Sequence, residues 1–480
     1  MRFPQAGPGT GRWLRWAPIA CTAALALVAG GCGDADEDDA ATSEPTAGTW
    51  KTWVPATAKL TVPAPPADDS AAAKKDEAGL KAAVDARTPR QELIARNYGT
   101  APVVAPWLDT TMELVSRRPK DPPSSSRSYG YVTAALEDAV IAAYRMKYKY
   151  KRDAPDGDES PDPSYPSAHA AMAGAASRLI GYLYPEYPAA RLSERADDVG
   201  EALVASGANY PSDVAAGLQL GRKVAELYIE QASKDGYTRK WNGKRPHGPV
   251  YWEPPPGSTS QPIQPLAGTW ETWLLKPVDR FQPPAPPKYG TKQFIANARD
   301  VMRVKEQLTP RQKQLAKFWE AGPGTALPAG VWNKVVLAYK PAKELSVPRQ
   351  VRLFAMLNVA MADAGAAAWN AKFQTGWWDP RPINSIRDLG LDKTWEPLLG
   401  TPSFPAYPSG TSNYSGAAGE VLAHVFGDDA EMWRARAVDA GMSRLWGGVH
   451  WRIDVTQGLK MGRQVGDLVV DRAKADGAET

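Results

Sequence analysis

The stretch LFAMLNVAMADAGAAAWNAKF, residues 353–373, is rich in Ala, Leu and Met, and its apolar residues recur at the i, i+3 and i+4 spacing of a buried helix. Two later stretches also carry helix signals. SNYSGAAGEVLAHVFG (412–427) has a Ser start and a Gly stop, and VTQGLKMGRQVGDLVVDRA (455–473) has its apolar positions on one face. Alternation of valine and isoleucine of the strand type is nearly absent. The sequence therefore predicts an all-α protein.

The first stretch has a counterpart 225 residues earlier, where EDAVIAAYRMKY aligns with ADAGAAAWNAKF and pairs Lys147 with Lys372. Four further matches follow the same order: AGTWKTWVP (47) with AGTWETWLL (267), TPRQ (88) with TPRQ (309), YPSAH (165) with YPSGT (407), and NYPSDVAAGLQLGR (209) with HWRIDVTQGLKMGR (450). Such self-similarity predicts a duplication. We expect two tandem helical bundles, a degenerate N-terminal repeat at 47–244 and a C-terminal domain at 266–480, joined by a Pro-rich linker at 245–265.

The N-terminus has the pattern of a secretory signal. Arginines at positions 2, 12 and 15 precede a short apolar run (16–29) that ends in AGGC at Cys32. We expect residues 1–32 to be a lipoprotein signal peptide, with Cys32 acylated and the protein held outside the cytoplasm on the bacterial cell membrane. The alternative is plain secretion with Cys32 incidental. Residues 33–46, GDADEDDAATSEPT, are acidic and predict a disordered tether.

Composition restricts both the partners and the bonds that stabilise the fold. The net charge is +4, from 57 basic and 53 acidic residues, which gives no reason to expect nucleic acid as a partner. The two cysteines are Cys21 and Cys32, and Cys21 lies in the segment that would be removed. The mature chain could then form no internal disulfide, so its fold would depend on its core.

Basic residues in the second half predict an anion site. Lys372, Arg381 and Arg444 supply three positive charges, which suit a tetrahedral oxyanion with a charge of about −2. The turn Pro408-Ser409-Gly410-Thr411 precedes a predicted helix, so its backbone N–H groups and the helix dipole would favour the same anion.

A histidine and an aspartate complete this set. His450 and Asp454 are four residues apart, a spacing that puts them on one face of a predicted helix. There the carboxylate can accept a hydrogen bond from Nδ1–H of His450 and leave Nε2 free as a nucleophile. A phosphate-shaped pocket with one oriented histidine is what phosphoryl transfer through a phosphohistidine requires.

The K…RP pair, the PSG turn and SRLWGGVHWRID (443–454) resemble the three signature motifs of the phosphatidic acid phosphatase type 2/vanadium haloperoxidase superfamily. TPRQ…FWEAGPGTALPAGVWN and the 353–373 stretch resemble its bacterial soluble haloperoxidase-like branch. The resemblance covers most of 260–475 and, more faintly, 47–235, and it implies helical bundles of the haloperoxidase/acid phosphatase type. It also implies that His450 attacks phosphorus or ligates vanadium and that Asp454 orients it. The residues that would grip phosphate or vanadate oxygens are Lys372, Arg381, Ser409, Gly410 and Arg444.

The sequence departs from the superfamily pattern in two places. The superfamily has six residues between the lysine and Arg-Pro, whereas FQTGWWDP places eight between Lys372 and Arg381. The second motif of the superfamily ends in a histidine that donates a proton to the leaving group, and Thr411 stands at that position. Threonine cannot supply this proton near neutral pH.

The first copy lacks a different set of residues. Its alignment places Ala154 and Leu203 at the two arginine positions and Asn209 at the nucleophile, which predicts a bundle without turnover. It keeps Lys147, Ser167, His169 and Asp213. His169 either caps a helix in a scaffold or serves as an acid for the His450 site across the bundle interface. The remaining histidines, at positions 247 and 424, are predicted to be structural.

These residues support three hypotheses. The first is an extracytoplasmic phosphatase that hydrolyses phosphate esters or anhydrides without a cofactor, on a phosphorylated small molecule or a lipid headgroup. The second is a vanadate-dependent haloperoxidase, and the third is a non-catalytic lipoprotein that binds a phosphorylated ligand. The sequence ranks the phosphatase first, impaired by Thr411, because the missing histidine argues for weak peroxidase activity.

Overall fold

The structure, a computed structural model, describes residues 43–479 except 101, 118–120 and 156–160. The predicted signal peptide, Cys32 and tether residues 33–42 lie outside the described residues, so the lipid anchor and the extracytoplasmic location remain predictions. Within the described part the regular elements are helices and no strand occurs, which confirms the predicted all-α fold.

The first half contains η1 (Ala47–Thr49), η2 (Pro55–Lys59), α1 (Ala71–Asp85), α2 (Pro89–Thr100), α3 (Ala105–Arg117), α4 (Pro122–Tyr150), α5 (Ala168–Leu183), α6 (Ala189–Ala205) and α7 (Pro211–Lys234). The second half contains η3 (Ala267–Thr269), α8 (Lys292–Glu306), α9 (Pro310–Phe318), α10 (Leu327–Leu337), α11 (Lys340–Lys343), α12 (Val347–Trp369), η4 (Asn370–Gln374), α13 (Pro382–Asp388), α14 (Gly410–Val425), η5 (Gly427–Asp429), α15 (Ala430–Trp446) and α16 (Arg452–Ala473).

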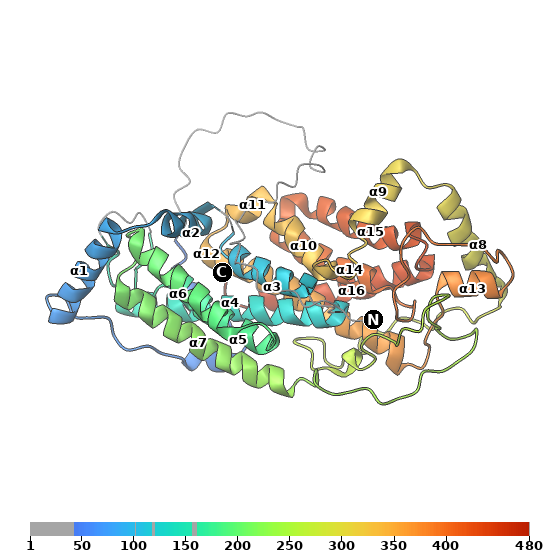
Figure 1. Cartoon of the computed structure of the whole chain (residues 1–480), viewed down its shortest axis with the longest axis horizontal. Helices are drawn as coiled ribbons and strands as arrows, with labels where there is room; N and C mark the ends of the chain where they lie inside the picture. The colour runs from blue at the N-terminus through green and yellow to red at the C-terminus, as the bar shows by residue number, and fades with distance from the viewer. Residues whose placement is uncertain (1–42, 101, 118–120, 156–160, 480) are drawn as a thin grey trace, which may run out of the picture. The chain divides into compact units, whose positions relative to one another are not determined.

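The two halves repeat one order of elements along the chain (Figure 1). Helices α4, α5, α6 and α7 occupy the same places in this order as α12, α14, α15 and α16. In each half the last helix packs closely on the one that follows the motif turn, α7 on α5 and α16 on α14. The duplication as an origin of this order remains a prediction.

The central helices α4 and α12 join the two halves. They lie against each other, and Gly130 of α4 makes the approach close, since an added Cβ would stand 3.2 Å from that of Ala362. One hydrophobic cluster contains residues from both halves, so the bundles share a core. The stretch Val347–Gln374 is long and apolar enough to cross a membrane, and it is this buried core helix.

A buried arginine on each central helix fixes the end of the last helix of its half. Arg127 donates from Nε to Asp235 at 2.6 Å and from Nη2 to a carbonyl near the end of α7 at 3.1 Å. Arg352 donates in the same way to Asp476 at 2.8 Å and to a carbonyl near the end of α16 at 3.0 Å. Each buried guanidinium is thus paired, which removes most of the cost of burying its charge.

The Pro-rich linker at 245–265 runs over the second half as irregular chain. Trp252 is fully buried, and its backbone N–H donates to the backbone carbonyl of Trp378 at 2.5 Å. Further along, the N–H of Ile263 donates to the carbonyl of Ser403 at 2.9 Å. The linker therefore packs against the loop that leads to Arg381 and is fixed there by hydrogen bonds.

Residues 43–46 of the predicted tether pack against the protein. Glu44 is buried and forms an ion pair with Arg349 at the start of α12. Ser43 donates from Oγ to Asp162 at 2.9 Å. These two side chains have partners on the folded surface, so residues 43–46 are ordered, in contrast to the prediction.

Helices α14 and α16 approach so closely that glycine is required where they meet. An added Cβ on Gly462 would stand 2.1 Å from the carbonyl oxygen of Asn413, and one on Gly416 would stand 2.4 Å from the carbonyl oxygen of Leu459. This contact sets how α14, which begins at the PSG turn, lies against α16, which carries Asp454.

We therefore expect Gly462→Ala to lower Tm. In a free helix the same change stabilises by about 1 kcal/mol, whereas overpacking here should destabilise by about 1–3 kcal/mol. Thermal unfolding followed by circular dichroism measures the difference. Gly322→Ala is the matched control, because a Cβ there would meet nothing within 4 Å. Equal Tm values for the two variants would contradict the close contact.

Candidate active site

The chain that leaves α12 positions Lys372 and Arg381. Helix α12 widens into the π-helix η4, and a loop with positive φ at Gly376 and Trp378 leads to α13. Arg381 is the N-cap residue of α13. Because a π turn holds more residues than an α turn, the widening takes up part of the longer Lys372–Arg381 spacing.

Lys372 lies beneath the turn that precedes α14. Its Nζ donates to the carbonyl oxygens of Pro405 at 2.7 Å, Ala406 at 2.9 Å and Pro408 at 2.5 Å. Burial, together with the charge of Arg381, lowers the pKa of Lys372 well below its ordinary value. Three acceptors satisfy the three donors of an ammonium group, so Lys372 shapes the turn and offers no free donor to an anion.

Arg381 is fully buried and reaches the imidazole of His450. Its Nε donates to the carbonyl of Phe404 at 2.8 Å, and Nη1 donates to the carbonyl of Val449 at 2.7 Å and to Nε2 of His450 at 3.0 Å. Nη2 is buried and has no hydrogen-bond partner among the described residues. Burial lowers the pKa of Arg381 to about 9, so the group is still a cation at neutral pH.

His450 is held as a neutral imidazole with its proton on Nδ1. A guanidinium only donates, so Nε2 must accept from Arg381 and Nδ1 must carry the proton. Nδ1 donates to Oδ2 of Asp454 at 2.9 Å, and the N–H of Trp451 donates to the same oxygen at 3.0 Å. Burial, and then the positive charge of Arg381, lower the pKa of His450 well below its ordinary value.

The contact between His450 and Asp454 is the predicted one, but its geometry differs from the prediction. Helix α16 begins at Arg452, so His450 lies just before the helix instead of within it. Trp451 is the N-cap, and the Asp454 carboxylate reaches back to it in the manner of a capping box. The helix start therefore fixes the carboxylate, which in turn orients the imidazole.

The PSG turn forms the start of α14. Ser409 is the N-cap, its Oγ accepts from the N–H of Ser412 at 3.3 Å, and its own N–H donates to the carbonyl of Asp454 at 3.0 Å. Gly410 is the first helical residue, and a Cβ there would stand 3.1 Å from the ring of Trp369. Thr411 follows and is half-buried. The turn is thus tied to the helix that carries the orienting carboxylate.

Arg444 lies in the last turn of α15 and is directed mainly at α9. Its Nη2 donates to the carbonyl of Ala316 at 3.1 Å, Nη1 donates to that of Glu320 at 3.4 Å, and Nε donates to Oγ of Ser443 at 3.0 Å. None of its hydrogen bonds within the described ranges reaches the imidazole of His450. Its positive charge still contributes to the lowered pKa of that imidazole.

These residues fit a tetrahedral oxyanion at Nε2 of His450. A buried donor without a partner, such as Nη2 of Arg381, costs about 1–3 kcal/mol. An oxyanion is the acceptor that a guanidinium fork matches best. The five residues that were predicted to bind the anion are all buried, and the lone pair of Nε2 already accepts a hydrogen bond from Nη1 of Arg381. An anion must therefore draw Arg381 away from the imidazole as it binds.

Asp379 is a site residue that the sequence reasoning missed. It lies in the lengthened loop two residues before Arg381, and its carbonyl accepts from the N–H of Ala406 at 2.9 Å. Burial, and then the charge of Asp454, raise the pKa of Asp379 well above its ordinary value. Burial also raises the pKa of Asp454 to about 7. The inserted loop was the available signal, but one aspartate in a loop forms no recognisable pattern.

In the first half, the residues that correspond to Ser409, His450 and Asp454 are bonded to each other or to a nearby arginine. Oγ of Ser167 donates to Asn209 at 2.9 Å, and Arg152 donates to Asp213 at 2.8 Å. The carboxylate that would orient a histidine is therefore bound to a guanidinium.

The remaining histidines lie at the start of α5, in the last turn of α14 and in the Pro-rich linker. His169 is the second residue of α5, and burial, with the charge of Lys147 from the same half, lowers its pKa to about 4. His424 is in the last turn of α14, as predicted, and contacts Glu479 at 2.8 Å. His247 is exposed in the linker.

The protonation of His450 can be tested directly. At pH 6.5, the ordinary midpoint of a histidine, its ¹⁵N signals should show a neutral ring with the proton on Nδ1. Long-range ¹H–¹⁵N NMR of the labelled chain measures this, and His450→Gln assigns the signals by their loss. A ring that is half protonated at this pH would contradict the lowered pKa.

Comparisons with known proteins show which proteins this chain resembles. A family model described as the VCPO second helical-bundle domain matches residues 352–438 and 430–476. The chain is 24% identical over 384 residues to vanadium chloroperoxidase from Curvularia inaequalis, a match that covers 65% of this chain and 63% of that protein. The chain thus spans less than two thirds of the length of this curated relative.

Solved structures extend the likeness. The crystal structure of the first bacterial vanadium-dependent iodoperoxidase matches with a TM-score of 0.66 and 26% identity, over 78% of this chain and 96% of its own. A holo-type bacterial vanadium-dependent chloroperoxidase shares the fold, with a TM-score of 0.56 and 18% identity over 80% of this chain and 96% of its own. Together these matches support the superfamily of phosphatidic acid phosphatases type 2 and vanadium haloperoxidases for this chain.

Proposed function

We propose that the protein is a vanadate-dependent haloperoxidase that uses hydrogen peroxide and a halide. The observation that carries the proposal is the neutral imidazole of His450, whose Nε2 lies beside the guanidinium of Arg381, and Nη2 of that guanidinium has no hydrogen-bond partner in the described part of the chain. The relatives described above are vanadium peroxidases, which supports this activity over phosphate hydrolysis. The order in which the sequence ranked the two functions is therefore reversed, since that ranking depended on Thr411 alone.

The chain's own residues would take distinct parts. Vanadate, when bound, would supply the centre at which peroxide is reduced to water while a halide is oxidised to hypohalous acid. His450 would hold it through Nε2, and Asp454 would keep the proton on Nδ1 so that this lone pair stays available. Arg381 would turn its donors to the vanadate oxygens. Lys372 would keep the turn before α14 in place.

Loading with orthovanadate tests this function. The loaded chain should oxidise iodide, followed as triiodide, and should brominate monochlorodimedone more slowly, because bromide is the harder halide to oxidise. His450→Gln, which lacks the Nε2 lone pair, should abolish both activities and the bound-vanadate signal in ⁵¹V NMR. His247→Gln, in the exposed linker, is the control. Retained vanadate binding in His450→Gln would falsify the assignment.

A phosphatase is the second candidate, favoured by the same neutral imidazole of His450. A neutral imidazole can attack phosphorus, and the cationic surroundings would stabilise the phosphoryl oxygens. The resulting phosphohistidine is then hydrolysed by water. A leaving group of high pKa would need a proton, which Thr411 does not provide. Binding of phosphate without either activity would correspond to the non-catalytic lipoprotein considered above.

Thr411→His separates these candidates. General-acid assistance contributes roughly 10²–10⁴ in rate, so halide oxidation should rise by at least about tenfold if the protein is a peroxidase. If it is a phosphatase, hydrolysis of glycerol phosphate should rise instead, and p-nitrophenyl phosphate, whose leaving group needs no proton, should change little. Thr456→His, at an exposed position of α16, is the matched control. A lack of gain in every assay would identify the lengthened 373–380 loop as the impaired part.

A further inference from the structure

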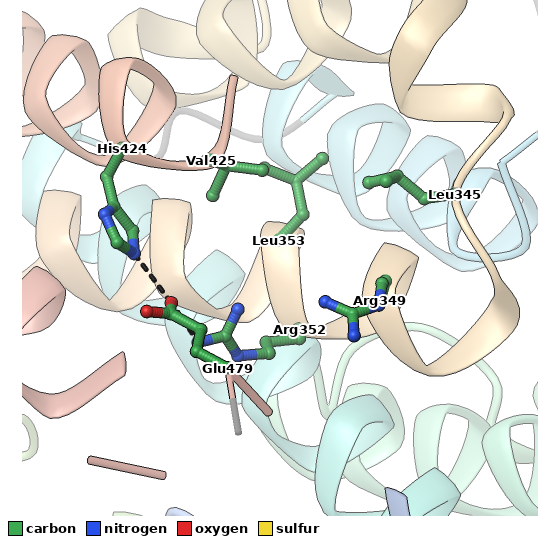
Figure 2. Close-up of a pocket in the computed structure, with 7 residues that line it drawn as sticks. All are labelled: Leu345, Arg349, Arg352, Leu353, His424, Val425 and Glu479. Atoms are coloured by element: carbon green, nitrogen blue, oxygen red, sulfur yellow. Dashed lines mark hydrogen bonds and ion pairs between the residues drawn. The ribbon is translucent and has the colours of Figure 1, made fainter. Parts of the chain in front are cut away.

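A polar hollow lies between α12 and the end of α14 that is far from the PSG turn. Its volume is about 270 Å³. Figure 2 shows Arg349, Arg352, His424 and Glu479 on its polar side, and aliphatic side chains, Leu353 and Val425 among them, on the other. Pockets for drug-sized ligands are about 300–1,000 Å³, so this one suits a single small ring.

The hollow already binds a carboxylate, that of Glu479. Its Oε1 accepts from Nη2 of Arg352 at 3.0 Å and lies 2.8 Å from Nε2 of His424. Burial opposes ionisation, but the hydrogen bonds from Arg352 and His424 hold the pKa of Glu479 below its ordinary value. Arg352 is only 6% exposed, so a deeply buried charged donor is aimed at this position.

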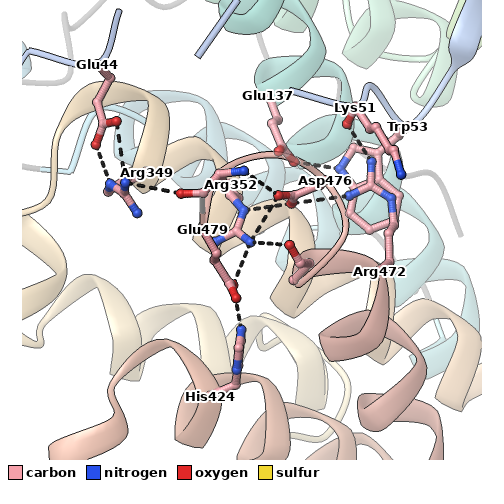
Figure 3. A network of polar contacts seen from close by, with 12 residues as sticks. Glu44, Lys51, Trp53, Glu137, Arg349, Arg352, His424, Arg472, Asp476 and Glu479 are labelled. Carbon is pink, nitrogen blue, oxygen red and sulfur yellow. Dashed lines mark hydrogen bonds and ion pairs between the residues drawn. The ribbon is translucent and has the colours of Figure 1, made fainter. Parts of the chain in front are cut away.

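The carboxylate of Glu479 is the exchangeable member of this network. Figure 3 shows that Arg352 is also paired with Asp476, which is buried and bonded at 2.8 Å. The side chain of Glu479, in contrast, is 32% exposed. Arg349 stands beside it, paired with Glu44. Another carboxylate could replace that of Glu479 with no change in the charge balance and without breaking the Arg352–Asp476 pair.

The first half shows how an aromatic ring packs on the arginine that corresponds to Arg352. Arg127 occupies the position of Arg352, and the ring of Tyr237 covers its guanidinium at 4.4 Å. Tyr237 comes two residues after Asp235, as Ala478 comes two residues after Asp476. The second half therefore has a methyl group where the first has an aromatic ring. Arg352 lines the polar side of the hollow although it is only 6% exposed, so its guanidinium is reached from there.

We propose that this hollow is a binding site for a small aromatic carboxylate. The ring would stack on the guanidinium of Arg352 as Tyr237 stacks on Arg127, with Leu353 and Val425 against its edge. The carboxylate would take the place of that of Glu479 at His424. The site is separate from the His450 chemistry and does not depend on the activity proposed above.

Benzoate is the probe, and calorimetric titration of the whole chain is the measurement. Benzoate should bind and benzyl alcohol, its neutral analogue, should not. Glu479→Ala removes the internal competitor and should tighten benzoate binding about tenfold, the effect of one charged hydrogen bond. Glu420→Ala is the matched control, because Glu420 is on α14 but pairs with Arg434 outside the hollow.

Ala478→Tyr places a ring at the position that Tyr237 has in the first half, where it should cover the guanidinium of Arg352 and weaken benzoate binding at least about tenfold. Thermal unfolding checks that this variant folds, and if it does not, the Glu479→Ala comparison decides alone. The proposal is overturned if Glu479→Ala binds no benzoate or binds it no more tightly than Glu420→Ala. Unchanged binding by folded Ala478→Tyr, or equal binding of benzyl alcohol, overturns it as well.

Discussion

Three cations are buried around one imidazole, and backbone carbonyl groups are what make this possible. Lys372, Arg381 and Arg444 are each less than 5% exposed, and each donates to main-chain oxygens of irregular segments or helix ends. A buried charge without such partners would cost several kcal/mol. The turns at 404–408 and 447–449, and the end of α9, are therefore parts of the site, because their carbonyls stabilise the positive charges that lower the pKa of the imidazole.

The helical fold and the His450–Asp454 contact could be predicted because both follow from local spacing. Apolar residues at helical intervals and an i, i+4 pair need no knowledge of distant segments. The carbonyl partners of Arg444 come from more than a hundred residues earlier in the chain, and the contact of Arg381 with Nε2 depends on the path of a loop. Neither follows from residue type. Every residue has a backbone carbonyl, so the sequence does not indicate which carbonyls accept hydrogen bonds. The three basic residues of the site could therefore be predicted, but the carbonyl groups to which they donate could not.

The two halves show that the same arrangement of helices can carry different side-chain contacts at matching positions. Asp213 is bound to Arg152 in the first half, whereas its counterpart Asp454 orients an imidazole in the second. Tyr237 packs on a buried arginine in the first half, whereas Ala478 stands at the matching position in the second. In both comparisons the arginine or carboxylate makes matching backbone contacts at the helix ends, and the neighbouring side chains differ.

The π-helix at Asn370–Gln374 bears on how such a site can change over time. A widened turn at the end of a core helix admits additional residues without shifting the register of anything upstream, so the packing of α12 on α4 is unaffected. The segment that follows can then lengthen or shorten while the lysine before it stays anchored. The loop beside the imidazole can therefore change in length between related proteins without altering the core on which folding depends.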